Sequence, residues 1–113
     1  MLGSAYADRL GGNGSANTLA GGAANDTLLG VGGADLLIGG DGNDLVDGQQ
    51  GDDTAFLGAG DDVFQWDPGD GNDVIEGQAD SDTMLFNGAN VGENFDVSAN
   101  GARVRFFRNV ATI

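Results

Sequence analysis

The sequence predicts an all-β fold, a parallel β-roll in which two nine-residue units make one circuit of a right-handed, β-helix-like solenoid. Three observations predict it. A nine-residue frame fits residues 3–65 without a gap and resumes at residue 68, the sixth place of this frame is almost always Asp, and the eighth place is always apolar. Units this short cannot bury their own apolar residue and must stack on others.

Each unit consists of a six-residue turn followed by a three-residue strand, as residues 39–47 (GGDGNDLVD) illustrate. Glycines at the first, second and fourth places allow backbone angles that are closed to residues with a Cβ. In the strand the eighth-place side chain lies on the opposite face from its two neighbours. We therefore expect one inward-facing apolar residue per unit.

The repeat domain is predicted to span residues 3–85, with units that start at residues 3, 12, 21, 30, 39, 48, 57, 68 and 77. Because a circuit holds two units, each unit lies over the second unit after it, and alternate sixth-place residues line opposite sides of the coil. The sixth place reads Asp8, Asn17, Asp26, Asp35, Asp44, Asp53, Asp62, Asp73 and Asp82. The eighth place reads Leu10, Leu19, Leu28, Leu37, Val46, Ala55, Phe64, Ile75 and Met84.

Two segments depart from the frame. The insertion Trp66-Asp67 precedes Pro68, and we expect Trp66 to cover the side of the roll, with a partner contact as the alternative. From residue 86 the period is lost, and residues 95–98 and 103–106 alternate around Asn100-Gly101, which is a hairpin signal. We expect residues 86–113 to form a C-terminal β-hairpin cap, whose arginines complement the acidic roll or bind an acidic polymer.

Composition excludes several classes of function. The chain has 18 acidic and 4 basic residues and a net charge of −14, which argues against a nucleic-acid partner. Cysteine and histidine are absent, so thiolate and imidazole metal ligands and the usual catalytic bases and nucleophiles are missing. We therefore expect no catalysis in this chain, with its paired carboxylates standing on solvent-facing turns. No apolar run is long enough to span a bilayer.

The stacked aspartates predict a divalent cation. Carboxylates about 4.8 Å apart repel by about 3 to 4 kcal/mol at an effective dielectric constant near 20. Lysine is absent, and no arginine lies between Arg9 and Arg103. Glycine-opened carbonyls and carboxylates from two stacked turns would form the all-oxygen cage that calcium prefers, with about six to eight ligands. We expect several Ca²⁺ ions, and folding that is coupled to their binding.

The units at residues 21–29 and 39–47 resemble the nonapeptide of the repeats-in-toxin family, the haemolysin-type calcium-binding repeats, and the resemblance covers about residues 3–85. It implies a β-roll that holds calcium between successive turns. The implied carboxylate ligands are Asp26, Asp35, Asp44, Asp53, Asp62, Asp73 and Asp82, and the implied carbonyl ligands are Gly33, Gly40, Gly42, Gly51, Gly60 and Gly71. Asp8 is set apart because its turn lacks the inner glycines, and Asn17 breaks the pattern.

The same resemblance implies a secreted bacterial protein that is exported by a type I secretion apparatus and folds outside the cell. We expect the chain to be a piece of a longer protein with an attached domain. Two interpretations of its function remain. One is a calcium-responsive folding and secretion module; the other is an adhesive or polysaccharide-binding module that uses Trp66 and the cap.

Overall fold

The computed structural model describes residues 2–66, 73–77, 81–87, 95–98 and 103–109, together with the side chains of these residues except at 66, 86–87, 95–98 and 103–109. All regular structure in these residues is β-strand. The strands are β1 (Arg9–Gly11), β2 (Thr18–Gly22), β3 (Thr27–Leu29), β4 (Leu36–Gly40), β5 (Leu45–Asp47), β6 (Thr54–Phe56), β7 (Val63–Trp66), β8 (Asp73–Glu76), β9 (Ser81–Asn87), β10 (Phe95–Ser98) and β11 (Arg103–Asn109).

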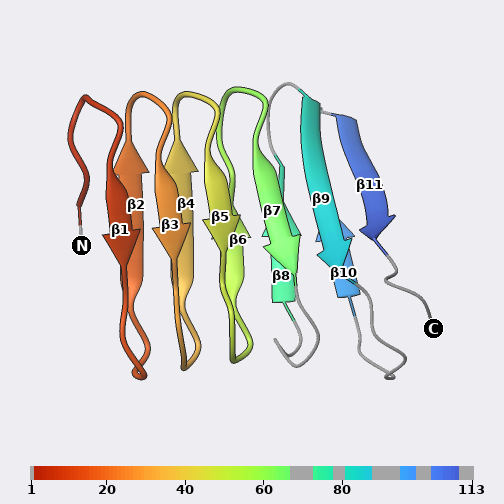
Figure 1. The fold of residues 1–113 in the computed structure, drawn as a ribbon, viewed down its shortest axis with the longest axis horizontal. Helices are drawn as coiled ribbons and strands as arrows, with labels where there is room; N and C mark the ends of the chain where they lie inside the picture. The colour runs from red at the N-terminus through yellow and green to blue at the C-terminus, as the bar shows by residue number, and fades with distance from the viewer. Residues whose placement is uncertain (1, 67–72, 78–80, 88–94, 99–102, 110–113) are drawn as a thin grey trace.

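The strands form two parallel sheets that face each other (Figure 1). Odd-numbered strands make a six-stranded sheet in the order β1-β3-β5-β7-β9-β11, and even-numbered strands make a five-stranded sheet in the order β2-β4-β6-β8-β10. The chain alternates between the sheets at every turn, so the turns gather at the two ends of the strands. The predicted parallel β-roll is confirmed.

The pairing register gives the length of each circuit. Leu10 pairs with Leu28, which lies two nine-residue units further along the chain, and this spacing holds through β7. Thr54 pairs with Val74, because the two-residue insertion lengthens this circuit. Phe95 pairs with Asp73, so the circuit that joins β8 to β10 is longer again. Insertions therefore lengthen individual circuits while the strands keep their parallel pairing.

The predicted hairpin between residues 95–98 and 103–106 is wrong. Strand β10 pairs in parallel with β8, and β11 pairs in parallel with β9, so the two segments lie in different sheets. The physical reason is that β8 and β9 would otherwise leave open edges, which invite pairing, and β11 gains seven residue pairs along β9. A local turn signal at Asn100-Gly101 is outweighed by these longer pairings. That residues 86–113 cover the end of the core stays a prediction.

The core consists of two facing columns of side chains, one from each sheet. All nine eighth-place residues are buried, and those from Leu19 to Met84 are at most 1% exposed. Leu10 is 8% exposed because β1 is the outermost strand of its sheet. Leu57, a first-place residue, joins this core at 1% exposure. Burying each such side chain contributes about 1.5 to 3 kcal/mol.

No helix in the described ranges is both long and apolar enough to cross a bilayer.

Candidate metal-binding turns

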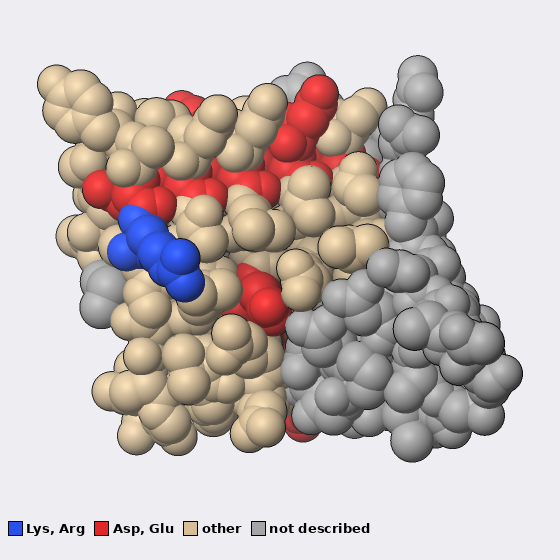
Figure 2. Space-filling view, in the orientation of Figure 1, with Lys and Arg blue, Asp and Glu red and all other residues tan. Residues whose placement is uncertain are grey.

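The turns form two rows, one at each end of the strands. Row I is defined here as the turns that precede β1, β3, β5, β7 and β9, and row II as the turns that precede β2, β4, β6 and β8. The sixth-place aspartates alternate between the rows as the period predicts: row I holds Asp26, Asp44 and Asp62, and row II holds Asp35 and Asp53. Asp82 and Asp73 continue the two series as residues of β9 and β8. Figure 2 shows acidic side chains in a band that crosses successive circuits near one end of the strands.

The turns between residues 21 and 62 share one backbone conformation, with positive φ at the second and fourth places. Seven of these ten residues are glycines, with φ between 87° and 120°. The other three are Ala24 (71°), Val31 (84°) and Gln49 (62°). A β-branched residue such as Val31 rarely adopts this region and does so at a cost in energy. The stack of turns therefore imposes the conformation even where glycine is absent.

Fourth-place residues also approach the neighbouring circuit closely. A Cβ on Gly42 would overlap the carbonyl oxygen of Ala24, and one on Gly60 would overlap that of Gly42. The carbonyl oxygens of Gly33, Gly42 and Gly51 accept no hydrogen bond within the described residues. These predicted ligand positions thus present free acceptor oxygens along both rows.

Second-place carbonyls are already engaged in the backbone. The Gly40 oxygen accepts a hydrogen bond of 3.0 Å from the amide of Ala59, and the Gly22 oxygen accepts one of 2.9 Å from Asp41. Gly40 was predicted as a carbonyl ligand together with Gly42. The structure distinguishes the two, since only the Gly42 oxygen keeps both lone pairs free. Gly71 lies outside the described residues.

The sixth-place carboxylates are turned inward, so the expectation that they stand on solvent-facing turns is wrong. Every one from Asp26 to Asp82 is at most 3% exposed. Each Oδ1 accepts a hydrogen bond from the backbone amide of the sixth-place residue one circuit earlier. In row I the donor–acceptor pairs are Asp8–Asp26 (2.8 Å), Asp26–Asp44 (2.7 Å), Asp44–Asp62 (2.7 Å) and Asp62–Asp82 (3.0 Å); in row II they are Asn17–Asp35 (2.7 Å), Asp35–Asp53 (2.8 Å) and Asp53–Asp73 (2.9 Å).

The second carboxylate oxygen has no such donor. Oδ2 of Asp26, Asp35, Asp44 and Asp62 is buried and accepts no hydrogen bond from any residue that the structure describes. It lies against the first-place glycine of its own unit in most turns: a Cβ on Gly21 would be 2.5 Å from Oδ2 of Asp26. First-place glycine therefore leaves room for this oxygen. A buried anionic oxygen without a partner is costly, and a proton or a positive charge beside it would reduce that cost.

Burial raises the pKa of three of these carboxyl groups. Desolvation is the largest cause for Asp35, whose pKa is raised, for Asp44, whose pKa is raised to about 6, and for Asp62, whose pKa is raised to about 8. In each case the amide hydrogen bond lowers the pKa and offsets only part of this effect. Repulsion from Asp26 and Asp41 raises the pKa of Asp44 further, and Asp44 and Asp82 do the same for Asp62. The rows therefore hold carboxylates that resist ionisation unless a counter-charge is present.

Leu57 marks one unit as different. It takes the first place in the unit of Asp62, where all the earlier units have glycine. A side chain thus stands where those units have only hydrogen, and the pKa of Asp62 is raised further than that of Asp44. The only sequence signal for this difference is the break in the first-place glycine column.

The donor set within the described residues is rich in carbonyls. No group of three or more Asp or Glu side chains there could hold a metal ion by themselves. A cation between two circuits would take its remaining ligands from the turn carbonyls, as calcium sites in proteins commonly do. Nitrogen and sulfur ligands, which zinc and copper prefer, are absent because the chain has neither histidine nor cysteine.

The first two turns are closed by their own side chains. Asp8 accepts hydrogen bonds from the Ser4 amide and, at 3.0 and 3.2 Å, from the Ser4 hydroxyl. Asn17 Oδ1 accepts one of 2.8 Å from the Asn13 amide. Neither turn has positive φ at its second or fourth place. The two turns that the sequence set apart therefore differ in backbone as well as in residue type.

Two predicted contact features fall outside the described side chains. These are Trp66 and the side chains of residues 95–98 and 103–109. Their proposed use in adhesion or polysaccharide binding stays a prediction. Periodicity located the sixth-place aspartates, but it gave no signal for the amide hydrogen bonds that orient them.

Comparison with known families gives one match. The model of the RTX calcium-binding nonapeptide repeat (4 copies) matches residues 2–37, 29–64 and 69–90. The matched segments together cover more than half of the chain and include all the turns with two left-handed places. No curated protein matches the chain significantly.

Proposed function

Since the chain belongs to the RTX calcium-binding nonapeptide repeat family, we propose that its stacked turns bind calcium ions between successive circuits. In this proposal the sixth-place carboxylates turn their Oδ2 atoms toward the ion. The residues that hold it are the carboxylates of Asp26, Asp35, Asp44, Asp53, Asp62, Asp73 and Asp82 and the fourth-place carbonyls of Gly33, Gly42, Gly51, Gly60 and Gly71. Asp8 and Asn17 are left out because hydrogen bonds within their own turns occupy their side chains.

One observation carries the proposal: within the described part of the chain, the buried Oδ2 atoms of Asp26, Asp35, Asp44 and Asp62 have no hydrogen-bond donor. A proton satisfies such an oxygen only below the pKa of its carboxyl group, whereas a cation satisfies it above that pKa as well. In this proposal bound calcium supplies positive charge that offsets the cost of burying the ionised carboxylates. Magnesium fits less well, because it prefers a smaller octahedral site and keeps several of its waters.

The thin core supports a second part of the proposal, that calcium binding and folding are coupled. Each strand from β1 to β9 contributes one eighth-place side chain to the core, and the charge of each row opposes folding. Ligands that are assembled only in the folded coil convert binding free energy into folding free energy. Calcium modules that act outside cells bind with dissociation constants of about 10⁻⁴ to 10⁻³ M, so such a chain would stay unfolded inside a cell and fold after export.

We further propose that the module has no catalytic role of its own and serves a longer secreted bacterial protein. The module would assist secretion of that protein by a type I secretion apparatus and, once folded, would stabilise an attached domain. This part is supported by the family and by the acidic, repeat-built character of the chain.

Far-UV circular dichroism tests the coupling. We expect a disordered spectrum in EDTA at pH 7.5 and a strand spectrum on titration with calcium, with a midpoint of about 0.1 to 1 mM. Magnesium at the same concentrations serves as the control and should leave the spectrum nearly unchanged. Isothermal titration calorimetry gives the number of ions bound. A full strand spectrum in excess EDTA at this pH would show that the coil does not need the cation.

A further inference from the structure

The two rows of turns differ at the fifth place, the residue just before the buried aspartate. Between residues 16 and 61, row I has Asn25, Asn43 and Asp61 there. Row II has Ala16, Ala34 and Asp52. The glycine, aspartate and apolar columns do not distinguish the rows in this way, because both kinds of turn carry them. The fifth place therefore separates two sets of candidate sites that are otherwise similar.

In row I the fifth-place side chains connect successive circuits. The amide of Asn43 donates to Oδ1 of Asn25 at 2.7 Å, and the amide of Asp61 donates to Oδ1 of Asn43 at 2.8 Å. The amide of Ser81 continues the series by donating to Oδ1 of Asp61 at 3.0 Å. Each of these hydrogen bonds uses only atoms of the protein chain.

These hydrogen bonds run in the direction opposite to those of the sixth place. At the sixth place, the side chain of the later circuit accepts from the amide of the earlier one, as in Asp26–Asp44. At the fifth place, the side chain of the earlier circuit accepts from the amide of the later one, as in Asn25–Asn43. From the turn of Asn25 onward, each pair of row I turns is thus tied in both directions.

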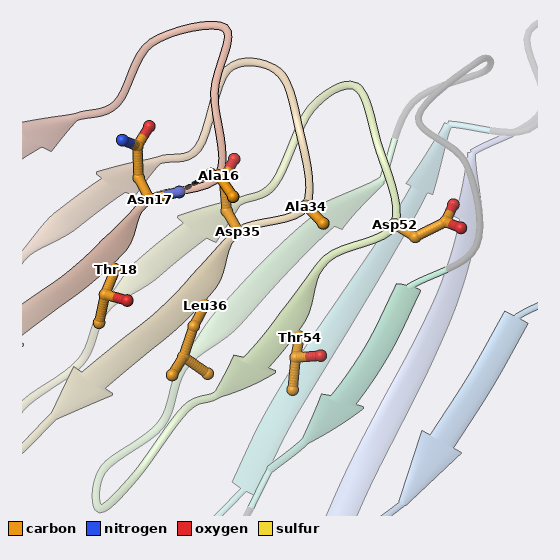
Figure 3. Close-up of a pocket in the computed structure, with 8 residues that line it drawn as sticks. All are labelled: Ala16, Asn17, Thr18, Ala34, Asp35, Leu36, Asp52 and Thr54. Atoms are coloured by element: carbon orange, nitrogen blue, oxygen red, sulfur yellow. Dashed lines mark hydrogen bonds between the residues drawn. The ribbon is translucent and has the colours of Figure 1, made fainter.

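Row II has a hollow where row I has these side chains. Ala16 and Ala34 lack a side-chain oxygen, so they cannot accept the amide of the next circuit. An open hollow of about 390 Å³ lies beside them, and Asp35, Asp52 and Thr54 also line it. Figure 3 shows Ala16, Ala34 and Asp52 on three successive turns, with Thr18, Leu36 and Thr54 on the strands beside them.

We propose that the fifth-place side chains make the two rows differ in their need for calcium: row I keeps its turns stacked at lower calcium, and row II opens first. The inference rests on the proposed calcium binding. It adds that ion loss is ordered, with the end of the coil that carries row II becoming accessible while the other end stays closed.

Two matched amides report on the rows. The amides of Asp44 in row I and Asp35 in row II each donate to Oδ1 of the sixth-place aspartate one circuit later in the same row, at 2.7 and 2.8 Å respectively. Both residues are buried, at 2% and 3% exposure. Hydrogen–deuterium exchange of the full chain, detected by NMR at a series of calcium concentrations, measures their protection separately. We expect the Asp44 amide to be about tenfold more protected than the Asp35 amide at limiting calcium.

Two double variants test the cause. N25A/N43A removes two fifth-place acceptors of row I. It should raise the calcium midpoint of the Asp44 amide, meaning the calcium concentration at which its protection is half-maximal, to that of the Asp35 amide. A16N/A34N introduces acceptors at the exposed alanines of row II and should lower the midpoint of the Asp35 amide toward that of Asp44. The second variant keeps the test decisive if the first fails to fold.

The outcomes separate this inference from the proposed function. If calcium protects neither amide, the proposed calcium binding fails. If calcium protects both amides with one midpoint, and neither double variant moves that midpoint, calcium binding stands and the ordered opening is overturned. An Asp35 amide that is protected at lower calcium than Asp44 also overturns it.

Discussion

Replacement of Asp44 by Asn should stabilise the metal-free chain and reduce what calcium adds to its stability. Asp44 lies in the middle of row I, is 2% exposed, and has one oxygen without a donor. Its pKa is raised from 3.8 to about 6. The difference of about two pH units corresponds to about 3 kcal/mol for burying the ionised group at pH 7.5. Asn removes this cost, while the new amide group costs about 1 to 3 kcal/mol if it finds no acceptor.

The expected gain in the free energy of folding without metal is therefore up to about 3 kcal/mol. In the presence of calcium, by contrast, the substitution should reduce the stability that calcium binding adds to the folded chain. At a calcium concentration 100 times the dissociation constant, one site adds about 2.7 kcal/mol. A hundredfold loss of affinity leaves about 0.4 kcal/mol of this, so the calcium-induced increment should fall by about 2 kcal/mol for each weakened site.

Circular dichroism at pH 7.5 measures both parts. In EDTA, folding is driven with trimethylamine N-oxide, which strengthens burial by its exclusion from the protein surface. The trimethylamine N-oxide concentration at which half of the chain is folded should be lower for Asp44→Asn than for the unsubstituted chain. In calcium, urea unfolding gives the increment. Asp41→Asn is the matched control, because it removes one charge from an exposed place in the same turn. An unchanged calcium increment in Asp44→Asn would refute a ligand role, and a less stable metal-free chain would refute the cost assigned to burial of its charge.

Three further predictions concern backbone, core and pH. Gly42→Ala, which combines φ of 112° with a clash against a carbonyl oxygen, should lower the free energy of unfolding by more than about 1 kcal/mol in urea melts; Gly14→Ala, where a Cβ meets nothing within 4 Å, should change it little. Phe64→Ala should cost about 3 to 5 kcal/mol in the same assay and Phe64→Leu much less, because the ring is fully buried. The metal-free chain should be most stable below about pH 4 and lose up to about 1.4 kcal/mol per pH unit for each of Asp44 and Asp62 as the pH rises, up to about 6 and 8 respectively. Stability falls with rising pH because the pKa values of these groups in the folded chain lie above 3.8, so the folded chain binds more protons than the unfolded chain. Osmolyte titrations in EDTA across pH 4–9 measure this dependence. A metal-free stability that rises with pH would contradict the prediction.

The sequence predicted the features of the fold that depend on period alone. A column such as Leu28, Val46 and Phe64 can be buried in a coil with two units per circuit, and the registers of these residues are the predicted ones. Alternation of aspartates between the two rows follows from the same count. Both predictions hold because a repeat fixes which residues lie above one another.

The sequence did not predict whether the aspartate side chains point into the coil or toward solvent. Asp44 belongs to the turn by its place in the unit, which suggested exposure, yet its carboxylate is buried against Gly39. The position of Oδ1 depends on the relative placement of two turns, which periodicity does not give. The hairpin at residues 95–106 failed for a related reason. Two residues at Asn100-Gly101 describe local geometry only, whereas pairing was decided by the strand edges of β8 and β9.

The hydrogen-bond ladder of the sixth place arranges the carboxylates but does not neutralise them. The raised pKa of Asp62, about 8, already includes the amide of Asp44 that donates to it. The remaining shift from 3.8 corresponds to about 6 kcal/mol when the group is ionised. A proton relieves this cost only below the raised pKa, and a bound cation would relieve it above that pKa. From Asp26 onward, each sixth-place Oδ1 accepts a hydrogen bond from an amide of the circuit before it. A circuit that opens would therefore deprive the circuit on one side of its amide donor and the circuit on the other side of its carboxylate acceptor. Calcium loss should therefore spread between adjacent circuits, as nearest-neighbour coupling in repeat proteins requires.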